Sequence, residues 1–227
     1  MKNNNRVKSG AKAKKQGHSF EESFADLHEG LETKGGSRTK IDIEGTYKGY
    51  KNLSLKNPSG KNTQVWLPSQ KTLFEALNLS KISQQFVKQF FGGNDYSDYN
   101  KNRVPLEEIA EYKSNSFLKE FNNKLSELFH LIFTHGHNMT GSVEALGWAN
   151  EKNNLDSLKF YDLSKLKKDF VEKGKWTFSS RRTTLHFHIG NKKILHLQMK
   201  GSGKKPGYHY PQFHLHGNFH DSWIIND

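Results

Sequence analysis

Residues 40–67, KIDIEGTYKGYKNLSLKNPSGKNTQVWL, decide the fold. Their short alternations of apolar and polar residues, separated by Gly, Asn and Pro, predict two or three short strands. Successive side chains of a strand point to opposite faces, so Asp42 should lie on the face opposite its two isoleucine neighbours. Ser54 and Lys56 should likewise point away from the leucines beside them. If the strands pair, a carboxylate, a hydroxyl and an ammonium group converge on one polar patch.

These three functional groups suit a divalent metal that acts on a phosphodiester. Carboxylate oxygen is a hard ligand of the kind that Mg²⁺ prefers, so Asp42 is a candidate metal ligand. Lys56 could orient the attacking water or neutralise charge on the phosphate. Asp42, Ser54 and Lys56 are therefore the first candidate catalytic residues.

A helix is predicted just upstream, over residues 19–33. Its apolar side chains recur every three or four residues and form one stripe, which holds Phe20, Phe24, Leu27 and Leu31. With about 100° between successive residues, Glu21 falls at the edge of that stripe and Glu22 faces solvent. Glu21 is therefore the acid that could reach a cleft.

Together these segments resemble the PD-(D/E)xK nucleases, the restriction-endonuclease-like superfamily. The core of that family is a helix followed by three strands, with an acid on one strand and (D/E)-x-K on the next. Here Asp42 and residues 54–56 (SLK) match the two strand positions, and residues 17–21 (GHSFE) resemble the G-x-x-F-E entry to the first helix. The chain departs from the pattern twice. No Pro precedes Asp42, and Ser54 replaces the second acid.

The resemblance implies an α+β (α/β) fold in which a helix is followed by a central mixed sheet. It implies Mg²⁺ held by Asp42, Glu21 and the carbonyl of Leu55, and DNA hydrolysis without a covalent intermediate. A chain of this size resembles a type II restriction endonuclease, which cuts palindromic double-stranded DNA as a homodimer. Repair nucleases, junction resolvases and homing endonucleases share the core, so those roles remain alternatives.

Composition points to the same class of partner. The 227 residues carry a net charge of +12 and no cysteine. Such a charge predicts an anionic partner. Nucleic acid is favoured over a membrane surface because no amphipathic basic helix stands out. No apolar run approaches the roughly 18 residues of a membrane span. Without cysteine there is no disulfide, thiolate zinc site or cysteine nucleophile, which fits a cytoplasmic protein.

The chain is expected to hold one domain behind a basic arm. Residues 1–16 contain six Lys or Arg and no acid, a pattern typical of a disordered arm. Residues 17–227 are expected to form a single nuclease domain. Within it, residues 17–69 begin the catalytic core, residues 70–138 form a helical subdomain or insertion, and residues 139–227 form a β-rich part. Strands are predicted in that part over residues 143–149, 156–162, 183–189, 193–199 and 212–217, with a short helix over residues 165–170.

The β-rich part is also the most basic. Residues 165–227 hold twelve Lys or Arg and four acids, so +8 of the charge lies there. Cations, glycines and aromatic rings suit contact with a nucleic acid backbone. The candidate DNA contacts are Arg181, Arg182, Lys200, Lys204, Lys205, Tyr208, His209, Tyr210, His214 and His216. Gln198 begins a second Q-x-K triplet, which is assigned to DNA contact because no acid stands on the strand before it.

The histidines allow more than one interpretation. His186 with His188, and His214 with His216, each share one face of a strand, and such pairs can bind zinc. Contact with phosphate or bases ranks first, a structural role second and metal binding last. A non-catalytic nucleic-acid-binding protein is the alternative function. It explains the charge but leaves the grouping of Asp42, Ser54 and Lys56 without a reason.

Overall fold

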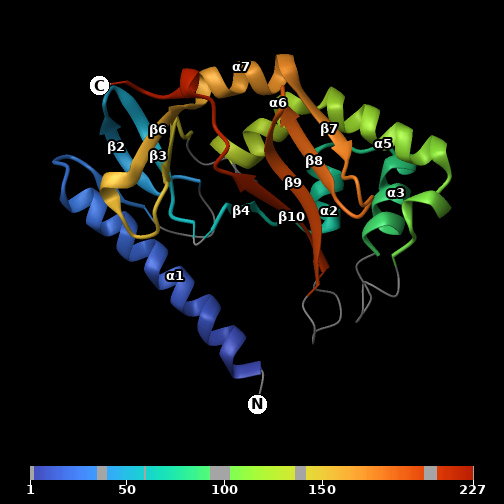
Figure 1. Ribbon diagram of the computed structural model, residues 1–227, viewed down its shortest axis with the longest axis horizontal. Helices are drawn as coiled ribbons and strands as arrows, with labels where there is room; N and C mark the ends of the chain where they lie inside the picture. Colours follow the sequence, from blue (N-terminus) through green and yellow to red (C-terminus); the bar gives the residue numbers. More distant parts are fainter. Residues whose placement is uncertain are drawn as a thin grey trace. The chain divides into compact units, whose positions relative to one another are not determined.

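In the computed structural model the chain is described over residues 3–34, 40–58, 60–92, 103–135, 142–201 and 209–226, with the side chains of residues 3–14, 199–201 and 209 left out. It divides into two compact units, each assembled from separate stretches. The first consists of Met1–Thr63, Phe133–Leu166 and His220–Asp227, and the second of Gln64–Ile132 and Lys167–Phe219. The expected α+β class with a mixed sheet is confirmed (Figure 1).

The first unit contains a five-stranded sheet in the order β1-β2-β3-β5-β6. Its strands are β1 (Glu32–Thr33), β2 (Ile43–Tyr47), β3 (Tyr50–Lys56), β5 (Ala145–Ala149) and β6 (Leu158–Asp162). Strands β3 and β5 are parallel and the other neighbours are antiparallel, which makes the sheet mixed. A two-residue turn joins β2 to β3, and both of its residues, Lys48 and Gly49, have positive φ (48° and 83°), as a tight hairpin requires.

Helix α1 (Asn3–Asp26) packs on this sheet through its apolar stripe. Phe24 is 3% exposed, and the centre of its ring lies 5.3 Å from that of Tyr47 and 5.6 Å from that of Phe160. Ile43, Leu53 and the other buried residues of β2, β3 and β5 complete the core of the first unit. The packing fixes which face of α1 turns towards the sheet.

The bounds of α1 differ from those predicted at both ends. Residues 3–16 are helical rather than a disordered arm, because the run AKAKKQ at residues 11–16 consists of strong helix formers. The helix also stops at Asp26, seven residues before the predicted end. Leu27 therefore lies outside it and is 68% exposed, so its assignment to the apolar stripe was wrong.

The second sheet has the order β4-β10-β9-β8-β7. Its strands are β4 (Asn62–Trp66), β7 (Gly174–Phe178), β8 (Leu185–Ile189), β9 (Lys192–Gly201) and β10 (His209–His216). Strands β7 to β10 pair antiparallel. The sequence predicted β8, β9 and β10 but not β7, whose five residues directly follow a helix and show no clear alternation.

Helices cover the middle of the chain, as predicted. They are α2 (Gln70–Ala76), α3 (Lys81–Phe91), α5 (Glu111–Asn123) and α6 (Leu125–Phe129), followed later by α7 (Leu163–Lys173). Helix α5 ends at Asn123, and α6 begins two residues later, at Leu125. Among the helices that the structure describes, none has both the length and the apolar character needed to cross a lipid bilayer.

An aromatic core joins these helices to the apolar face of the second sheet. The ring of Phe86 on α3 stacks on that of Phe117 on α5, with centres 4.7 Å apart. Phe121 on α5 then meets Trp176 on β7 at 5.5 Å, and Trp176 meets Phe187 on β8 at 5.2 Å. The second unit is therefore a helical layer packed on one side of a sheet, held largely by ring contacts.

Candidate active site

Asp42 lies directly before β2, and the backbone fixes its position. Its N–H donates to the carbonyl of Leu53 (2.9 Å), and its carbonyl accepts from the N–H of Lys34 (3.0 Å). Ile41 and Ile43 on either side are 6% and 0% exposed. Because side chains alternate along an extended chain, this burial turns Asp42 to the polar face, as the sequence predicted.

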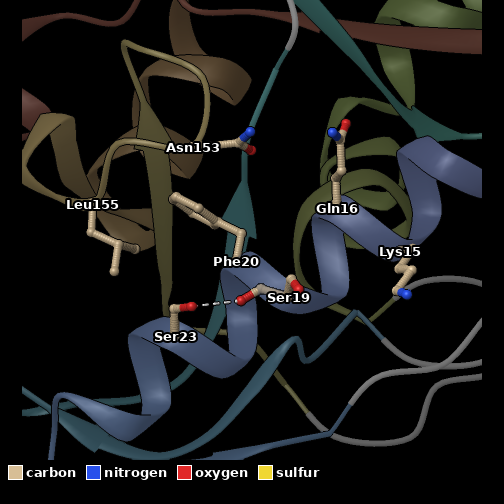
Figure 2. Close-up of a pocket in the computed structure, with 7 residues that line it drawn as sticks. All are labelled: Lys15, Gln16, Ser19, Phe20, Ser23, Asn153 and Leu155. Carbon is tan, nitrogen blue, oxygen red and sulfur yellow. Dashed lines mark hydrogen bonds between the residues drawn. The ribbon is translucent and has the colours of Figure 1, made fainter.

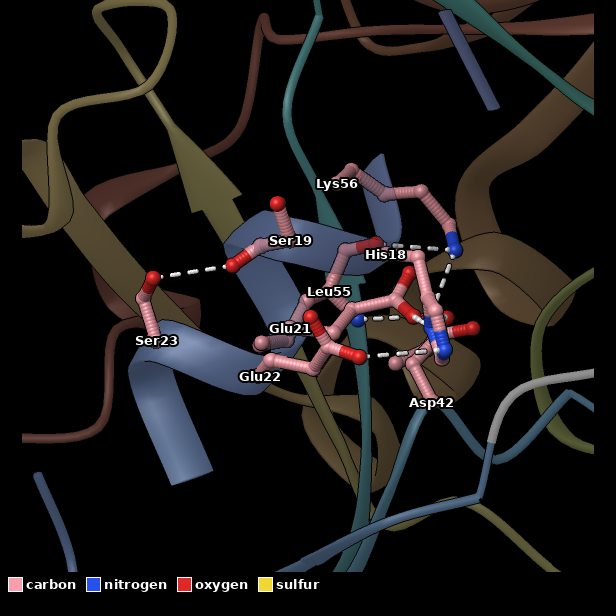
Figure 3. A network of polar contacts seen from close by, with 9 residues as sticks. His18, Ser19, Glu21, Glu22, Ser23, Asp42, Leu55 and Lys56 are labelled. Atoms are coloured by element: carbon pink, nitrogen blue, oxygen red, sulfur yellow. Dashed lines mark hydrogen bonds and ion pairs between the residues drawn. The ribbon is translucent and has the colours of Figure 1, made fainter. Parts of the chain in front are cut away.

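One carboxylate oxygen of Asp42 collects three hydrogen bonds from β3. Its Oδ2 accepts from Ser54 Oγ (2.9 Å). It also accepts from the N–H of Leu55 (2.8 Å) and from Lys56 Nζ (2.9 Å), two residues labelled in Figure 3. Lys56 Nζ also donates to the carbonyl of Leu55 (3.1 Å). The side chains of Asp42 and Lys56 are each 20% exposed, so the pair is accessible to a ligand. The structure thus brings Asp42, Ser54 and Lys56 together on one patch.

Glu21 reaches the same patch from α1 (Figure 3). Its side chain is 17% exposed, whereas that of Glu22 is 52% exposed, in line with the helical-wheel prediction. Burial, and after it the negative charge of Asp42, raises the pKa of Glu21, while a hydrogen bond from His18 and the charge of Lys56 lower it. Two carboxylates and an ammonium group are therefore within electrostatic range of one another.

Two residues of this region were not singled out from the sequence. His18 contacts both glutamates, with Nδ1 3.4 Å from Glu21 and Nε2 3.4 Å from Glu22, at the i,i+3 and i,i+4 spacings that bring helix side chains together. Lys40 stands two residues before Asp42 and so shares its side of the extended chain. Burial, and then the charge of Lys56, lowers the pKa of Lys40 to about 7, and Asp42 opposes this shift. Helical and strand periodicity could have indicated both residues.

The oxygen donors of the patch are few. Besides the Ser54 hydroxyl, which donates to Asp42, they are the carboxylates of Glu21 and Asp42 and the carbonyl of Leu55. Within the described part of the chain, no three or more His, Cys, Asp or Glu side chains are grouped so that they could hold a metal ion. Mg²⁺ commonly takes one or two protein carboxylates and completes its shell with water and phosphate oxygen. The donor set suits Mg²⁺ bound in this way and is too small for a metal enclosed by side chains.

The candidate DNA contacts belong to the second unit. Arg181 and Arg182 are exposed in the turn between β7 and β8, where Arg182 has a φ of 53° and its N–H donates to the carbonyl of Ser179 (2.8 Å). Tyr210 and His214 are partly exposed on β10, and His216 is buried there. Lys204, Lys205 and Tyr208, and the side chains of Lys200 and His209, lie outside the described residues, so their roles stay predictions.

A separate pocket of about 470 Å³ opens along another flank of α1 (Figure 2). It is lined by Lys15, Gln16, Ser19, Phe20, Ser23, Asn153 and Leu155. Asn153 is held in place by Asn57, whose Oδ1 accepts from its N–H at 2.8 Å. None of these lining residues belongs to the Asp42 patch, so the pocket is no part of that site.

Comparison with known proteins finds similarity only at the level of solved structures. No protein-family model matches the chain, and no curated protein matches it. Among solved structures, the chain is similar to restriction endonuclease MspI in a crystal structure with its cognate DNA. The TM-score is 0.47 and the identity 11%, over 81% of this chain and 69% of that chain. At these values the similarity assigns neither a family nor an activity.

Proposed function

We propose that the protein is a Mg²⁺-dependent endonuclease that hydrolyses phosphodiester bonds of double-stranded DNA. The observation that carries the proposal is the Asp42 carboxylate, held by Ser54, Leu55 and Lys56 with Glu21 beside it. An ion pair that served only to stabilise the fold would not be strengthened by a second, partly buried carboxylate. Like charges held close together raise a pKa at a cost in stability, and such arrangements concentrate at functional sites.

The metal would be held by Asp42, Glu21 and the carbonyl of Leu55. When bound, Mg²⁺ would supply Lewis-acid polarisation of a phosphate oxygen. Its charge would also offset the repulsion between the two carboxylates. The two carboxylates and the carbonyl described above fit a Mg²⁺ ion that is bound in this way.

Lys56 supplies the positive charge of the protein itself. Its ammonium group is oriented by Asp42 and by the carbonyl of Leu55, and it would stabilise negative charge that develops on the phosphate and orient the attacking water. Ser54 stands where the related nucleases carry a second acid. Its hydroxyl donates to Asp42 Oδ2, so in this chain it would orient the carboxylate rather than bind the metal.

The finer proposal is a sequence-specific enzyme of the type II restriction class that acts as a homodimer. One Asp42/Lys56 site can hydrolyse one strand, so a double-strand break needs two chains or two successive binding events of one chain. A two-fold dimer matches a palindromic target. The net charge of +12 supports a nucleic acid as the partner.

A supercoiled plasmid incubated with the protein and Mg²⁺, and in parallel with EDTA, tests the proposal. We expect discrete double-strand fragments with Mg²⁺ and none with EDTA, and a complex with DNA whose mass in solution corresponds to two chains. Random nicking, or cutting confined to branched DNA, would indicate a repair nuclease or a junction resolvase instead. Intact plasmid under all metal conditions would contradict the nuclease proposal.

A non-catalytic nucleic-acid-binding protein is the second candidate. One observation favours it, namely that Ser54 supplies a hydroxyl where a second strand carboxylate would strengthen the metal site. Binding of the plasmid without any cleavage in the same assay would select this function.

A further inference from the structure

The second sheet has an apolar face and a polar face of distinctive composition. Along β8 to β10, buried apolar residues alternate with polar ones, and the apolar set packs into the aromatic core. On the other face His186, His196 and His214 stand opposite one another across β8, β9 and β10, and Gln198 stands opposite Gln212. The five strands contain no Asp or Glu, and Lys175 and Lys193 stand opposite His188 on this face. This face therefore suits an anionic partner.

Hydrogen bonds hold these polar side chains in fixed orientations. Gln212 donates to Gln64 and accepts from Gln198 Nε2 (3.4 Å). Gln198 Nε2 also lies 3.1 Å from His214 Nε2. The donors and acceptors on β9 and β10 are thus arranged before any ligand binds, which lowers the entropic cost of binding.

The imidazole rings form a second set of contacts on the same face. His196 Nδ1 lies 2.8 Å from His216 Nε2. The rings of His196 and His214 are stacked, with centres 4.5 Å apart and an interplanar angle of 4°. Neighbouring rings in such contact cannot all carry a positive charge.

The environment keeps His196 and His216 neutral. Burial, and then the charge of neighbouring histidines and Lys193, lowers the pKa of His196 to about 3. Burial and Lys193 lower the pKa of His216 to about 4. A neutral imidazole offers one donor and one acceptor, whereas a charged one only donates. The face thus presents neutral hydrogen-bonding groups flanked by lysine.

We propose that the polar face of the β9–β10 hairpin contacts base edges in the major groove of duplex DNA and supplies sequence discrimination. The inference rests on the proposed function for the identity of its partner. The major groove admits a two-stranded β-ribbon, and amide and imidazole groups can match the donors and acceptors on base edges. Gln198 and His214 are partly exposed and are the proposed contacts. Gln212 and His216 are buried and are positioning residues.

The spacing of the hairpin fits that of stacked bases. Side chains two residues apart on one face of a strand, such as His196 and Gln198, are about 7 Å apart along it. That distance matches two base-pair steps of about 3.4 Å each. The spacing of successive side chains on the face is therefore close to the distance between every second base pair.

Base contact also explains the chemistry better than contact with phosphate. Phosphates are bound mainly by cations, and these contacts carry no sequence information directly. Neutral glutamine and histidine would add little to such binding but can distinguish bases. Among the described residues of this face, no three or more His, Cys, Asp or Glu side chains are grouped so that they could hold a metal ion.

The test is selection of bound duplexes from a random oligonucleotide pool by the full chain, with Ca²⁺ in place of Mg²⁺ so that the pool is not cleaved. We expect the wild type to enrich a short motif. Gln198→Ala and His214→Ala should each lose preference at one or two positions, and discrimination of the enriched duplex from a scrambled one should fall by about 10-fold or more. Their binding of the scrambled duplex and their salt dependence should match the wild type.

Two control variants separate base contact from charge and from general damage. Lys193→Gln should keep the motif but reduce the slope of log affinity against log salt by about 0.9 if it contacts one phosphate. Gln85→Ala, at an exposed position of α3, should behave as the wild type does. An unchanged motif in both Gln198→Ala and His214→Ala, or a reduced salt slope in either, would overturn the inference.

The outcomes also separate this inference from the nuclease proposal. A wild type that cuts plasmid but enriches no motif would overturn the inference and leave the nuclease proposal standing. A wild type that never cuts but enriches a motif that the variants lose would support the inference and contradict the nuclease proposal. Failure to bind any duplex would overturn both.

Discussion

The ammonium group of Lys56 is fixed by two acceptors, Asp42 Oδ2 and the carbonyl of Leu55, before any substrate is present. A charge held in this way stabilises a transition state without the cost of reorganisation. The ion pair itself is partly exposed, so its contribution to folding is small. At the scale of the residue, we therefore expect Lys56 to matter more for the proposed reaction than for the fold.

Lys56→Met should lower the single-turnover rate of DNA cleavage by about 10²–10³-fold, because it removes one preorganised charge from the phosphate. Binding of DNA should persist, since many other cations contribute to it. Lys51→Met, at an exposed position of the same strand, is the matched control. Equal rates for the two variants would exclude Lys56 from the reaction.

Glu21→Gln should impair cleavage and raise the Mg²⁺ concentration needed for half-maximal rate, because it removes a negative metal ligand. Glu22→Gln should do neither. The pair is well matched, since His18 contacts both side chains and loses one partner in each variant. A titration of rate against Mg²⁺ checks this, and superimposable curves for the two variants would mean that α1 does not contribute to the site.

The sequence predicts on which side of the strands Asp42, Ser54 and Lys56 lie. It does not predict how far the neighbouring side chains are buried. The period of two in a strand defines the side on which Asp42, Ser54 and Lys56 lie, whatever the rest of the fold. Lys40 shares that side, but its environment depends on burial by residues distant in the sequence. Its altered pKa is therefore a tertiary effect that local patterns cannot supply.

At the scale of elements, α1 is positioned by aromatic packing on the first sheet. Phe24→Ala should lower the free energy of unfolding by about 3–5 kcal/mol, because it removes a buried ring and leaves a cavity. Leu27→Ala should change it by less than about 0.5 kcal/mol, because Leu27 is 68% exposed. Chemical denaturation of both variants measures this. A comparable loss in Leu27→Ala would show that the helix continues past Asp26.

The polar face of the second sheet should make stability depend on pH. In an unfolded chain histidine has a pKa of about 6.5, whereas in the fold the pKa of His196 is about 3 and that of His216 about 4. Below pH 6.5 the unfolded state therefore binds protons that the folded state does not, so stability falls as pH falls. Above that value the rings are neutral in both states and contribute nothing.

The charged and titratable groups that face these two rings are Lys193, His186, His188 and His214. Each of the two rings should contribute at most about 1.4 kcal/mol per pH unit. His196→Gln should flatten the profile of unfolding free energy between about pH 6.5 and about pH 3. Parallel profiles for the variant and the wild type would contradict the assignment.

Elements with strong periodicity were predicted and those without it were not. Alternation of apolar and polar residues predicted β8, β9 and β10, and residues 70–138 were correctly expected to be helical. Strand β7 is short and directly follows α7, so its pattern merges with that of the helix. The helix over residues 3–16 was missed because the charge pattern was given more weight than helix propensity.

At the scale of the whole molecule, the sequence predicted the fold class but not which segments pack together. Periodicity shows that β8, β9 and β10 each have an apolar face. It does not show that Phe121 meets Trp176, a contact that joins parts of the chain more than fifty residues apart. Such pairing depends on the complementary shapes of side chains, which one sequence does not reveal.

The central claim is that the carboxylate of Asp42 is required for metal-dependent cleavage of DNA. The most direct measurement compares plasmid cleavage in Mg²⁺ by the wild type and by Asp42→Asn, a change that keeps the shape of the side chain and removes its charge. Asp156→Asn, at an exposed position of the same unit, is the control.

We predict that the wild type and Asp156→Asn cut the plasmid at the same rate. Asp42→Asn should bind DNA but produce no cleavage above the level seen with EDTA. Cleavage by Asp42→Asn at the wild-type rate would contradict the account.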